Sequence, residues 1–296
     1  MMHIYFVSLG CDKNLVDSEK MLALLAKEGY ELTDEPEQAE IIVVNTCAFI
    51  HDAKQESIET LLELAEYKKT GKCKVLIASG CLAERYQDTI LEEMPEIDGV
   101  IGTTAYDDIA VVVKKTLGGE HTALTKELDY LPVHLTDRVT SGMSHVGYLK
   151  ISEGCNKNCT YCIIPSMRGH YRSVPMEDLI EEAEKLAEKG IRELILVAQE
   201  TTLYGVDLYH EKKLPELLRR LSEIRDIAWI RVLYCYPEEI TLELAQELRN
   251  NPKVCHYLDL PIQHCNDEVL KRMGRRTTKA ELMEKIKMLR TEIPGI

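Results

Sequence analysis

Short apolar runs alternate with amphipathic segments along the first 117 residues of the chain. The apolar runs are rich in β-branched residues, which is typical of buried strands, and they span His3 to Ser8, Ile41 to Asn45, Val75 to Ser79 and Gly99 to Gly102. The segments between them have helical spacing and predict helices from a cap at Asp17 and Ser18 to Gly29, and over about Asp52 to Lys69, Glu84 to Met94 and Asp107 to Leu117. This alternation predicts a doubly wound, parallel α/β sheet in an N-terminal domain, residues 1–117.

The same alternation returns further along the chain. Residues 118–140 show no sustained period and contain Pro132, and we interpret them as a linker, because long unstructured loops are uncommon inside a domain. A second domain is predicted over residues 141–296, with strands near 146–151, 193–199, 229–235 and 256–262 and helices between them. This order predicts a partial barrel of parallel strands. The chain ends in a Pro-Gly turn after four such strands, so we expect the barrel to be incomplete at its C-terminus.

Three cysteines follow the predicted strands of the first domain. Cys11, Cys47 and Cys81 each come two or three residues after the carboxyl end of a different strand. In a parallel sheet these ends meet at one edge, so the three thiols are predicted to gather there. A single free cysteine is usually a small buried hydrophobe, but three at equivalent positions favour a metal site. We interpret them as ligands of an iron–sulfur cluster.

Three more cysteines lie together in the second domain. Cys155, Cys159 and Cys162 form a CxxxCxxC loop after a predicted strand. Four-iron clusters normally take four cysteines, so three leave one iron open for another ligand. Zinc is the alternative at this point, although structural zinc sites usually draw on a second CxxC pair, and the sequence contains none.

The cysteine content and the net charge indicate the compartment in which the protein works and the kind of partner it binds. The chain carries ten cysteines among 296 residues, and its first apolar run, Ile4 to Leu9, is too short for a signal peptide, so we expect a reducing, cytoplasmic location. A formal net charge of −14 disfavours loose binding to nucleic acid and fits a basic partner, or simply solubility. The sequence shows no apolar stretch long enough to span a membrane.

A resemblance to a known family appears once these motifs are read together. CxxxCxxC with an aromatic residue before its last cysteine resembles the radical S-adenosylmethionine superfamily. The whole chain resembles the methylthiotransferases within it, through segments that include Ser8-Leu9-Gly10-Cys11, Val44-Asn45-Thr46-Cys47, Ser79-Gly80-Cys81-Leu82-Ala83-Glu84-Arg85-Tyr86, Thr201-Thr202-Leu203-Tyr204-Gly205 and Leu258-Asp259-Leu260-Pro261-Ile262-Gln263-His264.

The resemblance implies two 4Fe-4S clusters and S-adenosylmethionine as cofactors. The second-domain cluster would bind S-adenosylmethionine, with Tyr161 beside its adenine, and reduce it to methionine and a 5′-deoxyadenosyl radical. The cluster on the first three cysteines would hold the sulfur that is transferred. Such enzymes also depend on a sulfur donor and on a reductant such as flavodoxin or ferredoxin. Their chains complete the barrel and add a small β-rich TRAM domain, which we expect this chain to lack.

The flanking residues select the substrate that the resemblance implies. Lys13-Asn14-Leu15 and Ile163-Ile164-Pro165-Ser166 resemble the group that methylthiolates the β-carbon of an aspartate in small-subunit ribosomal protein S-twelve. Asp12 departs from the proline expected there. The alternative is the sister group, which methylthiolates an adenosine in transfer RNA and shares the six cysteines.

Other polar residues fall at predicted strand ends. We predict that these residues contact S-adenosylmethionine or substrate, although each could equally be a hydrogen-bonded structural group. They are Gln199, Glu200, Asp259, Gln263 and His264. Cys235 and Cys265 are interpreted as spare thiols, and the basic run Lys271 to Arg276 as a solvated face. Two other classes of protein remain open, a two-cluster electron carrier and a zinc-stabilised interaction module.

Overall fold

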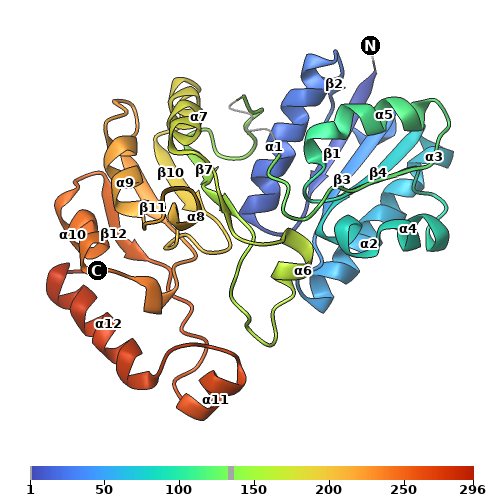
Figure 1. Cartoon of the computed structure of the whole chain (residues 1–296). Helices are drawn as coiled ribbons and strands as arrows, with labels where there is room; N and C mark the ends of the chain where they lie inside the picture. The colour runs from blue at the N-terminus through green and yellow to red at the C-terminus, as the bar shows by residue number, and fades with distance from the viewer. Residues whose placement is uncertain (1, 133–136) are drawn as a thin grey trace. The chain divides into compact units, whose positions relative to one another are not determined.

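The computed structural model of the chain describes residues 2–132 and 137–296 (Figure 1). The contacts divide the chain into two compact units. The N-terminal unit comprises Met1–Val139 with Ser166–Arg168, and the C-terminal unit comprises Thr140–Pro165 with Gly169–Ile296. Each unit is described separately below.

A six-stranded sheet forms the centre of the N-terminal unit. All its pairings are parallel, in the order β2-β1-β3-β4-β5-β6. The strands are β1 (His3–Ser8), β2 (Glu31–Leu32), β3 (Ile41–Thr46), β4 (Val75–Gly80), β5 (Gly99–Ile101) and β6 (Thr122–Leu124). Every residue of β3 and of β4 is buried, which explains why both strands are continuous apolar runs with no polar alternation.

Helices cover both faces of this sheet, as the predicted doubly wound fold requires. They are α1 (Asp12–Lys27), α2 (His51–Ala65), α3 (Tyr67–Thr70), α4 (Cys81–Glu93) and α5 (Ile109–Leu117), with short 3₁₀ turns η1 (Pro36–Gln38) and η2 (Tyr106–Asp108). Met21 and Leu25 of α1 share one apolar core with Ile109 and Val112 of α5, and Figure 1 shows these two helices side by side. The pocket described below shows that α2 and α4 are neighbours as well.

The sequence did not reveal the edge strands β2 and β6, which have two and three residues and little apolar pattern. β6 lies inside the stretch predicted as a linker, and it pairs with β5 from Thr122 to Leu124. Further on, the Val139 amide donates to the Glu19 carbonyl oxygen of α1 at 3.1 Å. Residues 118–132 and 137–139 therefore belong to the N-terminal unit, while 133–136 of the predicted linker lie outside the described residues.

Helix α1 begins earlier than predicted. The expected cap, Asp17 with Ser18, lies inside the helix, which begins at Asp12 with Cys11 as its N-cap. Both residues are buried and bind outside the helix: Asp17 pairs with Arg168 at 2.9 Å, and the Ser18 hydroxyl donates to the Ser8 hydroxyl at 2.8 Å. Asp17 and Ser18 are residue types that often cap helices, but here their side chains make tertiary contacts instead. The predicted start of α4 at Glu84 was also late, since that helix begins at Cys81.

The C-terminal unit contains the predicted partial barrel. Its four parallel strands lie in the order β12-β11-β10-β7, so each lies beside its predecessor in the sheet, as in a β/α barrel. They are β7 (Val146–Lys150), β10 (Glu193–Val197), β11 (Trp229–Val232) and β12 (Val254–Leu258), and a separate antiparallel pair joins β8 (Ser152–Glu153) to β9 (Arg172–Ser173). The sequence did not predict β8 and β9.

Helices between these strands, and two more after β12, make up the rest of the unit. They are α7 (Met176–Glu188), α8 (Val206–Tyr209), α9 (Leu214–Ser222), α10 (Leu242–Asn250), α11 (Asp267–Arg272) and α12 (Lys279–Glu292), with the 3₁₀ turn η3 (Pro237–Glu239), and α6 (Ile164–Arg168) connects this unit to the other. Leu179 of α7, Leu217 of α9 and Leu244 of α10 pack with the strands in one apolar core. Among the described residues, no helix has the length and apolar character needed to cross a bilayer.

Candidate metal centres

The predicted gathering of cysteines at one edge of the N-terminal sheet is present. Cys11 follows β1, Cys47 follows β3 and Cys81 follows β4, and these three strands are adjacent and parallel. Between β1 and β3 the strand order reverses, because β2 lies on the other side of β1. In open α/β sheets ligands bind at such a reversal, outside the carboxyl ends of the strands.

Two glycines bring the backbone close together around these thiols. Gly10 has φ +88°, and a Cβ there would lie 2.8 Å from Cys47 Cβ and 3.0 Å from its Sγ. Gly80 also has φ +88°, and a Cβ would lie 2.2 Å from Asn45 Oδ1. Both positions need a left-handed backbone and have no room for a side chain. The backbone just before Cys11 and Cys81 can therefore follow this path only with glycine.

Asn14 connects the strand ends that carry the cysteines. Its Nδ2 donates to the carbonyl oxygens of Leu9 and Thr46, both at 3.0 Å, and so joins the ends of β1 and β3. Its backbone oxygen accepts from Asn45 Nδ2 at 2.8 Å. Asn14 is completely buried. A buried amide with this many partners holds the loops in one arrangement.

Burial opposes thiolate formation at this site, and positive charge favours it. Burial raises the pKa of Cys47 and of Cys81, and the neighbouring thiols add to this effect. Arg168 acts in the opposite direction on the pKa of both cysteines. Cys11 caps α1 and Cys81 opens α4, so two helix N-termini also favour negative charge here. These thiols are suited to a cation that replaces their protons.

Arg168 is the functional candidate that sequence reasoning missed. It lies six positions after Cys162, yet its side chain is buried in the N-terminal unit. Its Nη2 donates to Cys81 Sγ at 3.5 Å. The only signal in the sequence is the position of Arg168 two residues after the motif Ile163-Ile164-Pro165-Ser166, and no spacing connects that motif to the first three cysteines.

A single metal ion does not fit the described residues, because no three His, Cys, Asp or Glu side chains there are grouped as ligands of one ion. A four-iron cluster has a different requirement, since each thiolate binds a separate iron and the sulfur atoms stand further apart. The arrangement of three cysteines at separate strand ends fits a cluster better than zinc.

The second cysteine motif lies in a loop of the C-terminal unit whose ends are fixed. β8 precedes the loop, and the Cys155 amide donates to the Gly169 carbonyl oxygen at 3.1 Å. On the far side, the Thr160 amide donates to the Met273 carbonyl oxygen at 3.0 Å. Gly274 packs so closely that a Cβ there would lie 2.6 Å from the Asn158 carbonyl oxygen. The segment after α11 thus holds the middle of the loop.

The basic run Lys271 to Arg276, which begins in the last turn of α11, was predicted to be a solvated face, and for Arg275 this was wrong. Arg275 is buried, stacks on the Tyr236 ring with 4.4 Å between guanidinium and ring centre, and pairs with Glu238 at 3.1 Å. Tyr236 lies with its hydroxyl 3.9 Å from Cys159 Sγ. A pocket of about 390 Å³ is lined by these groups and by Asn156 to Cys159. The pocket places open space beside the cysteine loop.

The four residues predicted to bind the cofactor lie in different surroundings. Gln199 lies near the loop, where its Nε2 donates to Glu153 Oε1 at 2.7 Å. Tyr161 is half exposed, and burial together with Cys159 raises its pKa. Gln263 and His264 are exposed in the turn after β12, where His264 Nδ1 accepts from the Asn266 amide at 2.9 Å. No described contact brings these last two residues to the cysteine loop.

Glu200 is the residue of that set best suited to binding a ligand. It is completely buried after β10, and its Oε1 accepts from the Thr202 amide at 3.0 Å and from the Thr202 hydroxyl. Its Oε2 is buried with no hydrogen-bond partner among the described residues. Burial raises the pKa of Glu200 to about 7. An orphaned carboxylate oxygen fits the positively charged amino group of an amino acid ligand.

The spare thiols and the remaining polar candidate have structural surroundings. Cys235 is buried, and its Sγ lies 3.4 Å from the Thr201 hydroxyl, whereas Cys265 is exposed. Asp259 Oδ2 accepts from the Tyr234 amide at 3.1 Å, a contact between the ends of β12 and β11. These contacts agree with the interpretation of Cys235 as a small buried residue.

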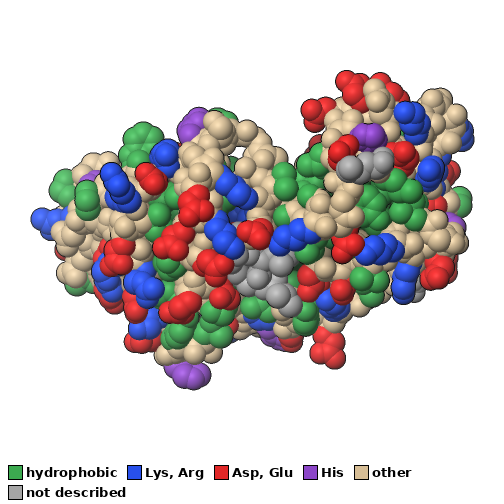
Figure 2. Space-filling view, turned by 90° about the horizontal axis from the view of Figure 1, so that it is seen from above, with side chains coloured by type: hydrophobic (Ala, Val, Ile, Leu, Met, Phe, Trp, Pro, Cys, Tyr) green, Lys and Arg blue, Asp and Glu red, His purple; other side chains and the backbone are tan. Residues whose placement is uncertain are grey.

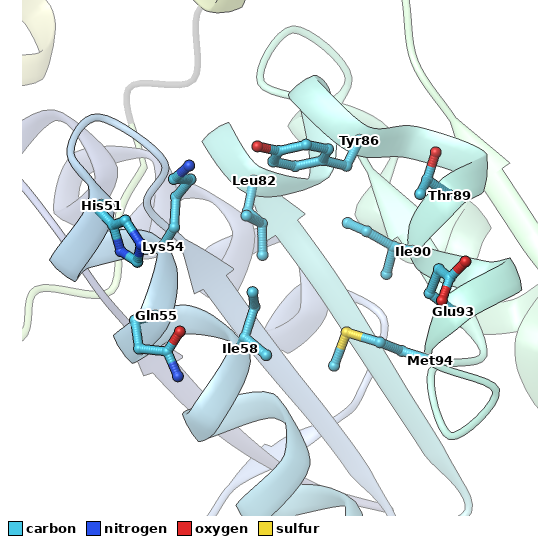
Figure 3. Close-up of a pocket in the computed structure, with 10 residues that line it drawn as sticks. All are labelled: His51, Lys54, Gln55, Ile58, Leu82, Tyr86, Thr89, Ile90, Glu93 and Met94. Atoms are coloured by element: carbon cyan, nitrogen blue, oxygen red, sulfur yellow. The ribbon is translucent and has the colours of Figure 1, made fainter.

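Figure 3 shows a second cavity, of about 220 Å³, in the N-terminal unit. Ile58 of α2, Leu82 and Ile90 of α4, and Met94 just after α4 point toward one another across it. None of its lining residues is a cysteine, and its walls are mainly apolar. It is separate from the cysteine site, although Leu82 follows Cys81 directly.

Comparison with family models assigns both parts of the chain. Residues 3–102 match the model of an uncharacterised protein family, UPF0004, and residues 149–296 match the radical SAM superfamily. The first match spans Cys11, Cys47 and Cys81, and the second spans the CxxxCxxC loop.

Curated relatives decide the family. A protein of Lachnoclostridium phytofermentans named ribosomal protein uS12 methylthiotransferase RimO is 61% identical over 295 residues, which is 100% of this chain and 67% of the relative. The chain belongs to the methylthiotransferase family of radical S-adenosylmethionine enzymes. RimO proteins of Clostridium perfringens and Acetivibrio thermocellus are each 53% identical, over 98% of this chain and 65% of theirs. The chain spans about two thirds of the length of these methylthiotransferases.

Solved structures share the fold. The radical S-adenosylmethionine methyltransferase TsrM of Kitasatospora setae, solved with tryptophan and an S-adenosylmethionine analogue, has a TM-score of 0.66 at 15% identity, over 99% of this chain and 66% of TsrM. The cobalamin-dependent enzyme OxsB has a TM-score of 0.64 at 12% identity, over 99% of this chain and 48% of OxsB. The predicted methylthiotransferase family and α/β fold are confirmed, and enzymes of this family use S-adenosylmethionine and 4Fe-4S clusters.

Proposed function

We propose that this chain carries both metal centres of a methylthiotransferase that acts on ribosomal protein uS12. Cys11, Cys47 and Cys81 would hold one 4Fe-4S cluster, and the CxxxCxxC loop would hold the other. The observation that carries the proposal is that the first three thiols follow adjacent parallel strands at the reversal in strand order. A pure electron carrier would have four cysteines at each cluster and no open iron.

The cluster in the loop, with S-adenosylmethionine bound, supplies the radical chemistry that can remove a hydrogen atom from the unactivated β-carbon of an aspartate. The chain's own residues bind and orient the cofactor. The free oxygen of Glu200 would accept from its amino group, and Tyr161, half exposed at the loop, would lie beside its adenine. Gln199 orients Glu153 next to the loop through its 2.7 Å hydrogen bond.

The protein substrate is favoured over transfer RNA by two observations. Relatives that match nearly the whole chain at 49–61% identity, in Lachnoclostridium phytofermentans, Clostridium perfringens, Acetivibrio thermocellus and Clostridium botulinum, are named uS12 methylthiotransferases. The formal net charge of −14 opposes binding to a polyanion. On the face in Figure 2, acidic and basic side chains of the described residues are interspersed, which agrees with this charge balance. The transfer-RNA activity is the second candidate, because that sister group has the same six cysteines.

Further partners follow from the chemistry. A low-potential reductant such as flavodoxin or ferredoxin would deliver electrons to the loop cluster, and a sulfur donor would supply the transferred sulfur. Ribosomal substrate and ten free cysteines point to the cytoplasm as the place of reaction.

Anaerobic reconstitution tests the radical activity. The chain is loaded with iron and sulfide, reduced with dithionite and given S-adenosylmethionine, and 5′-deoxyadenosine is measured. We expect its formation by the natural chain and none by a variant with Cys155, Cys159 and Cys162 all replaced by alanine. Absence of 5′-deoxyadenosine from the iron-loaded natural chain would refute the proposal.

A second assay decides the substrate. A uS12 peptide that contains the target aspartate and a transfer-RNA anticodon stem-loop are incubated in parallel, and their masses are compared. We expect one added methylthio group on the peptide. Addition to the RNA alone would assign the chain to the sister activity.

A further inference from the structure

The guanidinium of Arg168 is buried against the first three-cysteine site. Arg168 ends α6 and is 2% exposed. Its Nη2 donates to Asn14 Oδ1 at 2.6 Å and to Cys81 Sγ at 3.5 Å, and its Nη1 donates to Asp17 Oδ2 at 2.9 Å. One planar group therefore contacts a proposed cluster ligand and the amide that joins the strand ends.

The backbone fixes Arg168 in this place. The residue before it, Met167, accepts from the Thr103 hydroxyl at 2.8 Å through its carbonyl oxygen. Thr103 is held in turn by Glu84 of α4, whose Oε2 accepts from the Thr103 amide at 2.9 Å. The helix that begins at Cys81 thus also anchors the segment that delivers the arginine.

The guanidinium of Arg168 makes contacts beyond its ion pair with Asp17. A buried guanidinium is stable when it is paired, and Asp17 supplies one such carboxylate. Its second terminal nitrogen, Nη2, donates to Asn14 Oδ1 and also to the sulfur of Cys81. A cluster held by three thiolates is anionic and gains a further negative charge on one-electron reduction. Net charge and hydrogen bonds to the sulfurs set the potentials of such clusters.

We propose that Arg168 is a positioning residue for the N-terminal cluster, and that its charge and its N–H···S contact raise the reduction potential of that cluster. The inference rests on the proposed function only in that Cys11, Cys47 and Cys81 bind a cluster. It adds that a residue of the segment following the other cysteine motif tunes this centre.

The test isolates the N-terminal cluster in the full chain. Cys155, Cys159 and Cys162 are replaced by alanine together, so that iron in this background reports on the first site. Iron is counted, and the midpoint potential is then measured by titration with dithionite, in which each cluster accepts one electron, followed by electron paramagnetic resonance. A background that holds no iron contradicts the proposed function itself, before Arg168 is tested.

Four further variants are made in this background. Arg168→Met should retain iron and make reduction at least about tenfold less favourable, a shift of about 59 mV to lower potential for one electron. Arg168→Lys keeps the charge without the planar fork and should give a smaller shift. Asp17→Asn removes a negative charge and should shift the potential upward. Arg138→Met is the matched control, since Arg138 is equally buried and pairs with Glu19 of the same helix, and it should leave the potential unchanged.

The outcomes separate a tuning role from a purely structural one. An unchanged potential in Arg168→Met with its iron intact overturns the proposal, and so does an equal shift in Arg138→Met. If Arg168→Met holds no iron, Arg168→Lys decides. A cluster retained there with a lowered potential supports the proposal, whereas loss of iron or an unchanged potential overturns it.

Discussion

The buried carboxyl of Glu200 should make the stability of the metal-free chain depend on pH. Burial raises its pKa from an ordinary value of 4.5 to about 7, despite hydrogen bonds from Thr202 and the charge of Lys157, which act the other way. The folded chain then binds more protons than the unfolded chain between these two values. Stability contributed by the neutral carboxyl is therefore complete below pH 4.5 and is lost as pH rises toward 7 and above.

The magnitude follows from the two pKa values. Between pH 6 and pH 8 the loss amounts to about 1.3 kcal/mol, roughly a tenfold change in the unfolding constant. Glu200→Gln cannot ionise and keeps an oxygen to accept from Thr202, so this part of the pH dependence should disappear. The variant should exceed the natural chain in stability, and by more at pH 8 than at pH 6.

Urea unfolding of both metal-free proteins at the two pH values measures the effect. Fluorescence of Trp229, the single tryptophan, reports on the C-terminal unit, in which Glu200 also lies. For each protein we take the change in the free energy of unfolding between pH 6 and pH 8, and we compare the natural chain with Glu200→Gln. Equal pH dependence in the two proteins would show that Glu200 is not held neutral by burial, and the reasoning would fail.

Two other predictions concern the N-terminal unit. Cys47→Ala should lower the iron bound after reconstitution from about eight atoms per chain to about four, counted by elemental analysis, whereas Cys235→Ala should keep about eight. Equal iron in the natural chain and Cys47→Ala would contradict the assignment. Gly80→Ala should destabilise the unit by at least about 2 kcal/mol in urea unfolding, since its Cβ would lie 2.2 Å from Asn45 Oδ1. Gly29→Ala has a similar positive φ but no atom within 4 Å, so a cost as large as that of Gly80→Ala would count against the steric argument.

Much of the fold could be predicted because buried strands and amphipathic helices have local patterns in the sequence. β1 was predicted with the bounds that the structure has, and β3 and β4 to within one residue, since buried parallel strands are continuous apolar runs. The placement of Cys11, Cys47 and Cys81 then followed from topology alone. Short edge strands such as β2 have no such run, because neither of its residues is buried.

The failures involve residues whose partners are remote in sequence. Asp17 and Ser18 have the composition of a helix cap, and only their distant partners, Arg168 and Ser8, show why they lie inside α1. Arg168 is 151 positions from Asp17, and no periodicity or motif spacing connects the two. Arg275 was misjudged for the same reason, since its partner Tyr236 precedes it by 39 positions.

Ser166–Arg168 belong to the N-terminal unit, although the residues on either side of them in sequence belong to the C-terminal unit. This arrangement restricts how such a protein can evolve. Gene fusion or recombination at the boundary near residue 139 would separate the first three cysteines from the arginine that packs against Cys81. An ancestor that acquired one half from another protein would carry an α6 whose residues do not match those of its N-terminal unit. The two halves are thus expected to descend together, and a substitution at Asn14 or Asp17 to be accompanied in the same lineage by change at position 168.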